Sequence, residues 1–226
     1  MLLQILTYTH HLTTMLFGIF LSAFFLGVKQ NKKNVCILLG GGAVSGLFFL
    51  ICNTVFGSLF TEAVYPIFVH LPLFLLLVFY YRFRWLPSII SIMTAYLCCQ
   101  FSNWAGIFAL SLSGLDWVYY LVRIIVTVAV FAFLSRYLCQ TTALLFAKSD
   151  RELYILGAMP FVYYVFDYST TKFSMLLYSG NKVVVEFLAF AMCISYVIFL
   201  FVYFQEYELK NRAEQYGQLT NMPVSY

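Results

Sequence analysis

Charged residues are scarce in this chain of 226 residues. Asp, Glu, Lys and Arg together make up 10% of it, whereas hydrophobic residues make up 63%. Soluble domains carry roughly a quarter charged residues, so this composition excludes an ordinary water-soluble domain. The formal net charge is +4 without a clustered basic face, and we therefore expect no nucleic-acid binding.

Motifs for catalysis, metal binding and nucleotide binding are also lacking. The chain has three His residues, and none follows His70. There is no Ser, His and Asp set, no His-Glu-x-x-His and no zinc spacing of Cys and His. The run Gly40–Gly46 lies inside an apolar segment, so it is no phosphate loop. We expect no enzyme activity, no cofactor and no metal.

Long apolar stretches are what the chain has in abundance. A membrane span takes about 20 residues. Seven candidates lie near 11–28, 35–57, 63–81, 86–109, 117–135, 153–170 and 183–204. The 25 Phe and 18 Tyr residues suit lipid contact and the headgroup interface. The sequence predicts an all-α, polytopic bundle of about seven spans in the cell (cytoplasmic) membrane, with residues 1–204 as one transmembrane domain.

Basic residues predict the orientation of this bundle. A seven-span topology places most of them on one side: Lys29, Lys32, Lys33, Arg82, Arg84, Arg136, Lys148, Arg151, Lys210 and Arg212. Loops that stay in the cytoplasm are enriched in Lys and Arg. We therefore expect the N-terminus outside and the C-terminus in the cytoplasm.

Cysteines and glycines are expected to serve packing. All six cysteines fall in predicted spans or on the cytoplasmic side, which predicts free thiols. Gly42 and Gly46 have the four-residue spacing of small residues that lets membrane helices approach closely. This pair predicts contact with a neighbouring helix, and a homodimer face is the alternative.

Six polar residues lie inside the apolar stretches and form a candidate ligand site. At about 1.5 Å per residue, Asn53, His70, Asn103 and Arg123 lie roughly 10 Å from the outer ends of their spans. Asp167 and Glu186 lie roughly 5 Å deep by the same measure. Because polar groups are costly in hydrocarbon, such a band predicts a pocket that opens outward.

The roles of these polar residues leave alternatives open. Arg123 is the one cation of the band, and Asp167 and Glu186 are its possible counterions. The set either holds three spans together or contacts the charged end of a ligand. For His70, the favoured role is a hydrogen bond to backbone groups freed by Pro72.

The segment that follows the last span is a charged helix. No Gly or Pro interrupts the passage from residue 198 to residue 216, so one helix is expected to continue from the membrane into the cytoplasm. Glu206 with Lys210, and Glu208 with Arg212, are favourable i,i+4 pairs. Residues 205–226 are predicted to begin a signalling helix. Its candidate relay residues are Glu206, Leu209, Lys210, Ala213 and Tyr216.

Four segments carry a family resemblance: His70–Leu73, Arg82–Trp85, Thr94–Trp104 and Glu206–Tyr216. Together they resemble the membrane half of Gram-positive GHKL-type sensor histidine kinases, relatives of the peptide-sensing quorum kinases. The resemblance implies two-component signal transduction by a homodimer that detects an extracellular peptide or small molecule. In that family a phosphoacceptor His and an ATP-binding domain follow the membrane half and act on a response regulator. This sequence has neither, so it is expected to be a fragment or a truncated kinase.

The sequence thus predicts a sensor module that detects an extracellular or membrane-borne ligand and relays the signal through its last span. A small multi-span transporter or permease component is the alternative. A transporter should place polar groups and helix breaks near the membrane midplane, whereas this band is shallow. A membrane-embedded enzyme that uses Asp167 and Glu186 is a third possibility.

Overall fold

The computed structural model describes residues 2–57, 64–173 and 182–220, and every regular element within these ranges is helical. The predicted all-α fold is therefore confirmed. The helices are α1 (Leu2–Phe25), α2 (Lys32–Phe56), α4 (Tyr65–Phe68), α5 (His70–Leu75), the π-helical segment η1 (Leu76–Tyr80), α6 (Trp85–Cys98), α7 (Gln100–Ser113), α8 (Asp116–Tyr137), α9 (Cys139–Phe146), α10 (Asp150–Phe173) and α11 (Lys182–Thr220).

Four helical segments of the described chain are long and apolar enough to cross a membrane. They are Lys32–Phe56, the combined α6 and α7 over Trp85–Ser113, Asp116–Tyr137, and Phe187–Ala213 within α11. The three other predicted spans coincide with α1, with the broken helix α4–α5–η1, and with α10. Length and composition thus identify a helical membrane protein with four candidate spans.

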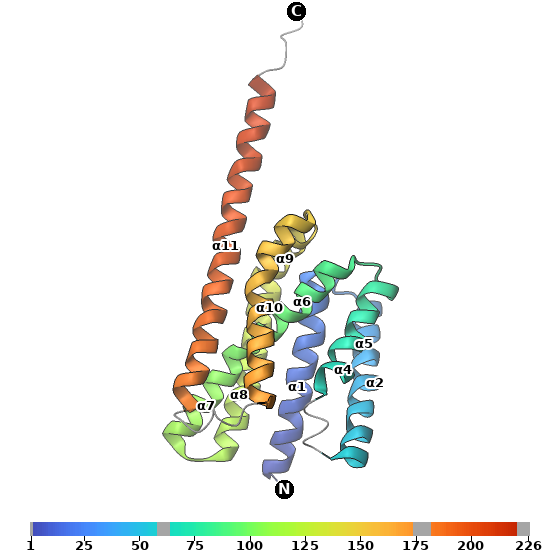
Figure 1. Ribbon diagram of the computed structural model, residues 1–226, viewed down its shortest axis with the longest axis vertical. Helices are drawn as coiled ribbons and strands as arrows, with labels where there is room; N and C mark the ends of the chain where they lie inside the picture. The colour runs from blue at the N-terminus through green and yellow to red at the C-terminus, as the bar shows by residue number, and fades with distance from the viewer. Residues whose placement is uncertain (1, 58–63, 174–181, 221–226) are drawn as a thin grey trace, which may run out of the picture.

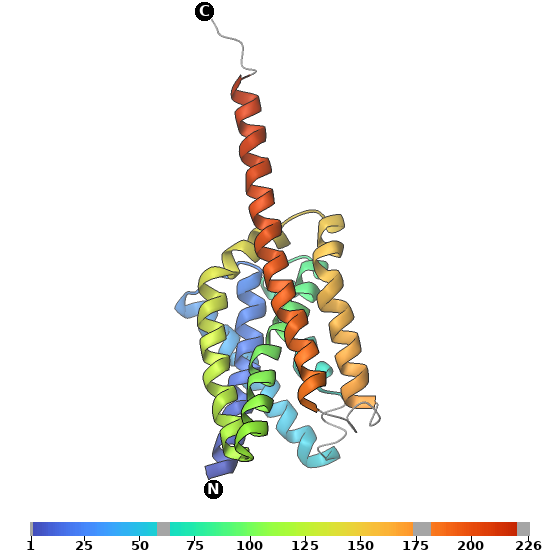
Figure 2. The ribbon, with the colours of Figure 1, turned by 90° about the vertical axis from the view of Figure 1, so that its left-hand side faces the viewer.

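The helices run up and down in one bundle (Figure 1). The N-terminus and the α7–α8 connection lie at one end of the bundle, and the connections α1–α2, η1–α6 and α8–α9–α10 lie at the other (Figures 1 and 2). Helix α11 leaves the bundle at this second end. The loops that carry the predicted cytoplasmic Lys and Arg residues therefore share one end, which we call the basic end.

The third apolar stretch is interrupted, although the sequence predicted it as one span. A Pro has no N–H and clashes with the carbonyl four residues before it. Pro72 accordingly follows the break between α4 and α5 at Val69. After α5 the helix widens, and the Tyr81 N–H donates to the Leu76 carbonyl five residues earlier, at 3.1 Å. Such π-helical turns are rare, and they frequently occur at functional sites.

Helix α1 packs against several partners. It contacts α2, α6, α8 and α9, and its Leu21 and Phe25 are fully buried. Gly42 and Gly46 of α2 face it: a Cβ on Gly42 would lie 3.1 Å from Ile19 Cδ1, and one on Gly46 would lie 3.4 Å from Met15 Cε. The predicted use of this glycine pair in helix packing is confirmed, and the partner is α1.

Helix α11 spans 39 residues without a break. At about 1.5 Å per residue it is roughly 58 Å long, about twice the hydrocarbon thickness of a bilayer. It begins within the bundle and projects far beyond the basic end (Figures 1 and 2). The predicted continuous helix is confirmed, and it crosses the expected boundary between residues 204 and 205.

Candidate functional site

A network of aromatic and ionisable side chains joins α5, α6 and α10. The Tyr96 hydroxyl donates a 2.5 Å hydrogen bond to Asp167 Oδ2. The Tyr164 hydroxyl lies 2.8 Å from His70 Nδ1. The Tyr96 ring packs edge-on against both His70 and Tyr164, with centroids 5.7 and 5.0 Å apart. Two of the predicted site residues, His70 and Asp167, thus belong to one interhelical network, which we call the tyrosine network.

Arg123 occupies a second, separate place on α8. Its Nη1 donates to the hydroxyl of Tyr119 one turn earlier, and its guanidinium carbon lies 5.1 Å from the centroid of that ring. Its aliphatic stem lies against Gly106 of α7, where a Cβ would come within 2.8 Å of Arg123 Cδ. Nε is enclosed by protein and has no acceptor.

Of the two counterions considered for Arg123, Asp167 does not pair with it. Arg123 bonds to Tyr119, and Asp167 bonds to Tyr96. Among the side chains that the structure describes, which do not include that of Glu186, no carboxylate lies within ion-pair distance of the guanidinium. Depth along a helix does not determine which way a side chain faces. Residues at similar depth therefore lie in two separate groups and not in the one band that the sequence predicted.

The remaining predicted site residues lie apart from both groups or outside the description. Asn53 is half-buried on α2, and its carbonyl accepts the Gly57 N–H at 3.1 Å. Asn103 is half-buried on α7, and its Nδ2 donates to Gln100 Oε1 at 3.2 Å. The side chain of Glu186 lies outside the described residues.

At the basic end, a cluster around Lys148 joins two loops to α11. Lys148 Nζ lies 3.4 Å from the Tyr207 ring centroid and 4.9 Å from that of Tyr203, so the ammonium is in cation–π contact with both. It also lies 3.6 Å from Glu152 Oε1, and the Lys148 side chain is only 8% exposed. Because Tyr203 and Tyr207 belong to α11, Lys148 fixes the point where that helix leaves the bundle.

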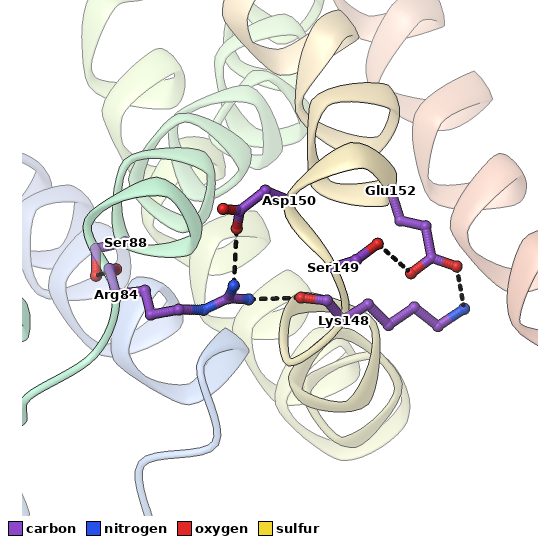
Figure 3. Close-up of polar contacts among 6 residues, drawn as sticks. All are labelled: Arg84, Ser88, Lys148, Ser149, Asp150 and Glu152. Carbon is purple, nitrogen blue, oxygen red and sulfur yellow. Dashed lines mark hydrogen bonds and ion pairs between the residues drawn. The ribbon is translucent and has the colours of Figure 1, made fainter.

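The same cluster reaches the η1–α6 loop through Arg84. Its Nη1 lies 2.7 Å from Asp150 Oδ1, and its Nη2 donates to the Lys148 carbonyl at 2.5 Å (Figure 3). Ser149 donates to Glu152 Oε2 at 3.1 Å and holds the start of α10 (Figure 3). The η1–α6 loop, the α9–α10 loop and α11 are thus joined in one continuous set of contacts, the basic-end junction.

The predicted relay residues on α11 are largely exposed beyond this junction. Leu209 is 67% exposed, and Glu206, Lys210 and Ala213 are exposed as well. Of the two predicted ion pairs, Arg212 Nη2 lies 3.7 Å from Glu208 Oε2. No ion pair joins Glu206 to Lys210, two residues that the structure describes. The side chain of Tyr216 lies outside the described residues.

Sequence reasoning missed three functional candidates: Tyr96, Tyr164 and the aromatic contact of Lys148. Tyrosines are common throughout the chain, so nothing in the sequence distinguishes Tyr96 or Tyr164. Tyr203 and Tyr207 do carry a signal, because two rings four residues apart lie on one face of a helix. That face points at the α9–α10 loop.

Comparisons with known proteins identify no relative: no family model, no curated protein and no solved structure matches the chain. The class that fold and composition define is an all-helical membrane protein with a long terminal helix that extends from the bundle.

Proposed function

We propose that this protein is a membrane sensor module of the histidine-kinase type, with seven spans, that relays a stimulus from its outer end to the cytoplasm through α11. In this proposal the basic end faces the cytoplasm, because retained loops are rich in Lys and Arg. The tyrosine network and Arg123 lie toward the outer half. Homodimers would bring two copies of α11 together beyond the membrane.

The observation that carries the proposal is the basic-end junction on an unbroken α11. A helix without a hinge transmits rotation or shift along its length, and α11 has no break between Lys182 and Thr220. Lys148 contacts α11 through the rings of Tyr203 and Tyr207, where the helix leaves the bundle. Arg84, in the loop after η1, bonds to the Lys148 carbonyl and to Asp150. A displacement of α5–η1 or α10 therefore has a contiguous path to α11.

Cysteine crosslinking along α11 tests the relay. Single cysteines at positions 206 to 213, in a variant without the six native cysteines, would be oxidised in native membranes. We expect dimer crosslinks that peak at Leu209 and Ala213, because residues four apart share one helix face. Lys148→Met removes the ammonium and should move the peak to other positions, whereas Lys32→Met, at the same end on α2, should leave it in place.

A collision control uses Ile125→Cys, which lies on the exposed face of α8. Absence of dimer crosslinks at all eight α11 positions, or crosslinking equal to that at residue 125, would contradict the proposal. If Lys148→Met does not alter the crosslinking pattern, the basic-end junction takes no part in the relay.

One observation favours the alternative of a small transporter. The segment after the break at Val69 lines a cavity of about 210 Å³ between α1, α2, α5 and η1, to which Ser45, Pro72 and Leu76 contribute. Broken helices beside a cavity are typical of transporters. A Ser45→Cys variant in proteoliposomes discriminates the two: a transporter should expose this thiol to impermeant reagents from each side in turn, and a sensor should not.

A further inference from the structure

Arg123 and Tyr119 form a hydrogen-bonded pair that can donate further hydrogen bonds. The Tyr119 hydroxyl accepts from Arg123 Nη1, which leaves its own proton to donate. The guanidinium has five N–H donors, and this bond uses one of them. Among the described side chains, no carboxylate neutralises the charge, and Nε is enclosed without an acceptor.

The surroundings of the pair hold it in place. Gly106 has no side chain, so the stem of Arg123 lies directly against α7. The bond to Tyr119 directs the guanidinium toward the start of α8, which lies at the end of the bundle opposite the exit of α11 (Figure 1). Arg123 is only half-buried, so part of its side chain remains accessible although its stem lies against Gly106.

An arginine in an apolar span is costly unless an anion or water balances it. Arginine N–H groups and a tyrosine O–H together match the oxygens of a carboxylate or a phosphate. We infer that Arg123 and Tyr119 bind an oxyanion, a carboxylate or phosphate group, near the outer end of the bundle. This inference rests on the proposed function, in which that oxyanion is the charged group of the stimulus.

Two sources supply such a group: a soluble ligand or the phosphate of a membrane lipid. The full chain is placed in phosphatidylcholine nanodiscs, and its thermal unfolding is followed by intrinsic fluorescence. One arm adds inorganic phosphate at constant ionic strength, with chloride as the reference. The other arm exchanges part of the lipid for phosphatidylglycerol.

We expect saturable stabilisation in at least one arm. An effect of phosphate identifies a site open to soluble anions, and an effect of phosphatidylglycerol alone identifies a lipid headgroup. Arg123→Gln should abolish the effect, and Tyr119→Phe should weaken apparent affinity by roughly threefold to tenfold, as loss of one hydrogen bond predicts. Arg136→Gln, an exposed arginine near the other end of α8, should leave it unchanged.

Three results would overturn the inference. One is the absence of stabilisation in both arms, and another is equal stabilisation of the wild type and Tyr119→Phe, a variant that retains the packed ring. The third is an anion effect that appears only in Glu186→Gln, because that carboxylate would then be the partner of Arg123. The stability test does not involve α11, so it can succeed even if the relay fails. A binding site without a relay would show stabilisation by phosphate, while phosphate would leave the crosslinking pattern of α11 unchanged.

Discussion

The hydrogen bond from Tyr96 to Asp167 places a carboxylate between two closely packed helices, α6 and α10. A hydrogen bond to a charged group contributes more than one between neutral groups. His70 and Tyr164 extend the same network to α5. The network therefore joins the broken third helix to the middle of the bundle through polar contacts that lipid cannot replace.

Removing the Tyr96 hydroxyl should measure this contact. Tyr96→Phe keeps the ring but withdraws one donor from Asp167, and we expect a loss of about 1.5–3 kcal/mol of unfolding free energy. Titration with a denaturing detergent, followed by circular dichroism, provides the measurement. Tyr154→Phe is the matched control, because Tyr154 is 59% exposed. Equal stability of the two variants would show that the contact contributes nothing.

The sequence identifies which residues are costly in a membrane, but it does not identify their partners. His70, Arg123 and Asp167 were recognisable because each is polar within an apolar stretch. Tyr96 and Tyr164 were not, because tyrosine is common in this chain and fits an apolar stretch. Whether Arg123 meets Asp167 depends on the rotation of α8 and α10 about their own axes, which depth alone leaves undetermined.

At the scale of helices, glycine positions set how closely neighbours approach. Gly157 of α10 lies against Ile90 of α6, where an added Cβ would come within 2.6 Å of Ile90 Cγ1. The Ile90 side chain is branched and buried, so it has little room to yield. This contact fixes the spacing of the two helices that carry Tyr96 and Asp167.

Gly157→Ala should therefore separate α6 from α10. We expect a loss of about 1–3 kcal/mol in unfolding free energy from overpacking. Gly18→Ala is the control, because a Cβ there meets nothing within 4 Å. That change should be neutral or stabilising by up to about 1 kcal/mol, since alanine favours a helix. The same denaturing-detergent titration tests both, and a stable Gly157→Ala would contradict the tight approach.

Helix boundaries show how far local sequence rules extend. The absence of Gly and Pro from residues 198–216 predicted the uninterrupted course of α11 there, and the structure has it. Pro72 lies beside the break at Val69, yet the third stretch was predicted as one span. The apolar composition of a segment indicates how long the segment is. A break within its helix depends on backbone hydrogen bonds, which composition does not specify.

Over the whole molecule, the basic loops are concentrated at one end of the bundle. The basic loops share the end where α11 leaves, and the α7–α8 connection lies at the other (Figure 1). If the bundle crosses the membrane as proposed, these two ends face different compartments.

Thiol accessibility tests this topology. In a variant without native cysteines, Ser113→Cys marks the α7–α8 end, and Gln30→Cys and Ala147→Cys mark the basic end. All three native residues are exposed. An impermeant reagent applied to intact cells should label Ser113→Cys alone, and the other two only after permeabilisation. The reverse pattern would invert the orientation, and labelling of all three in intact cells would contradict the proposed crossing.

The packing of α1 also has a consequence for biosynthesis. Its partners α6, α8 and α9 begin at residues 85, 116 and 139 and are therefore synthesised after it. Its buried His10 and Ser22 therefore enter the membrane before the helices that enclose them. Contacts between distant parts of a chain form late. Until these three helices have been synthesised, only α2 of the four helices that pack against α1 is present, and the polar side chains of α1 lack their final surroundings.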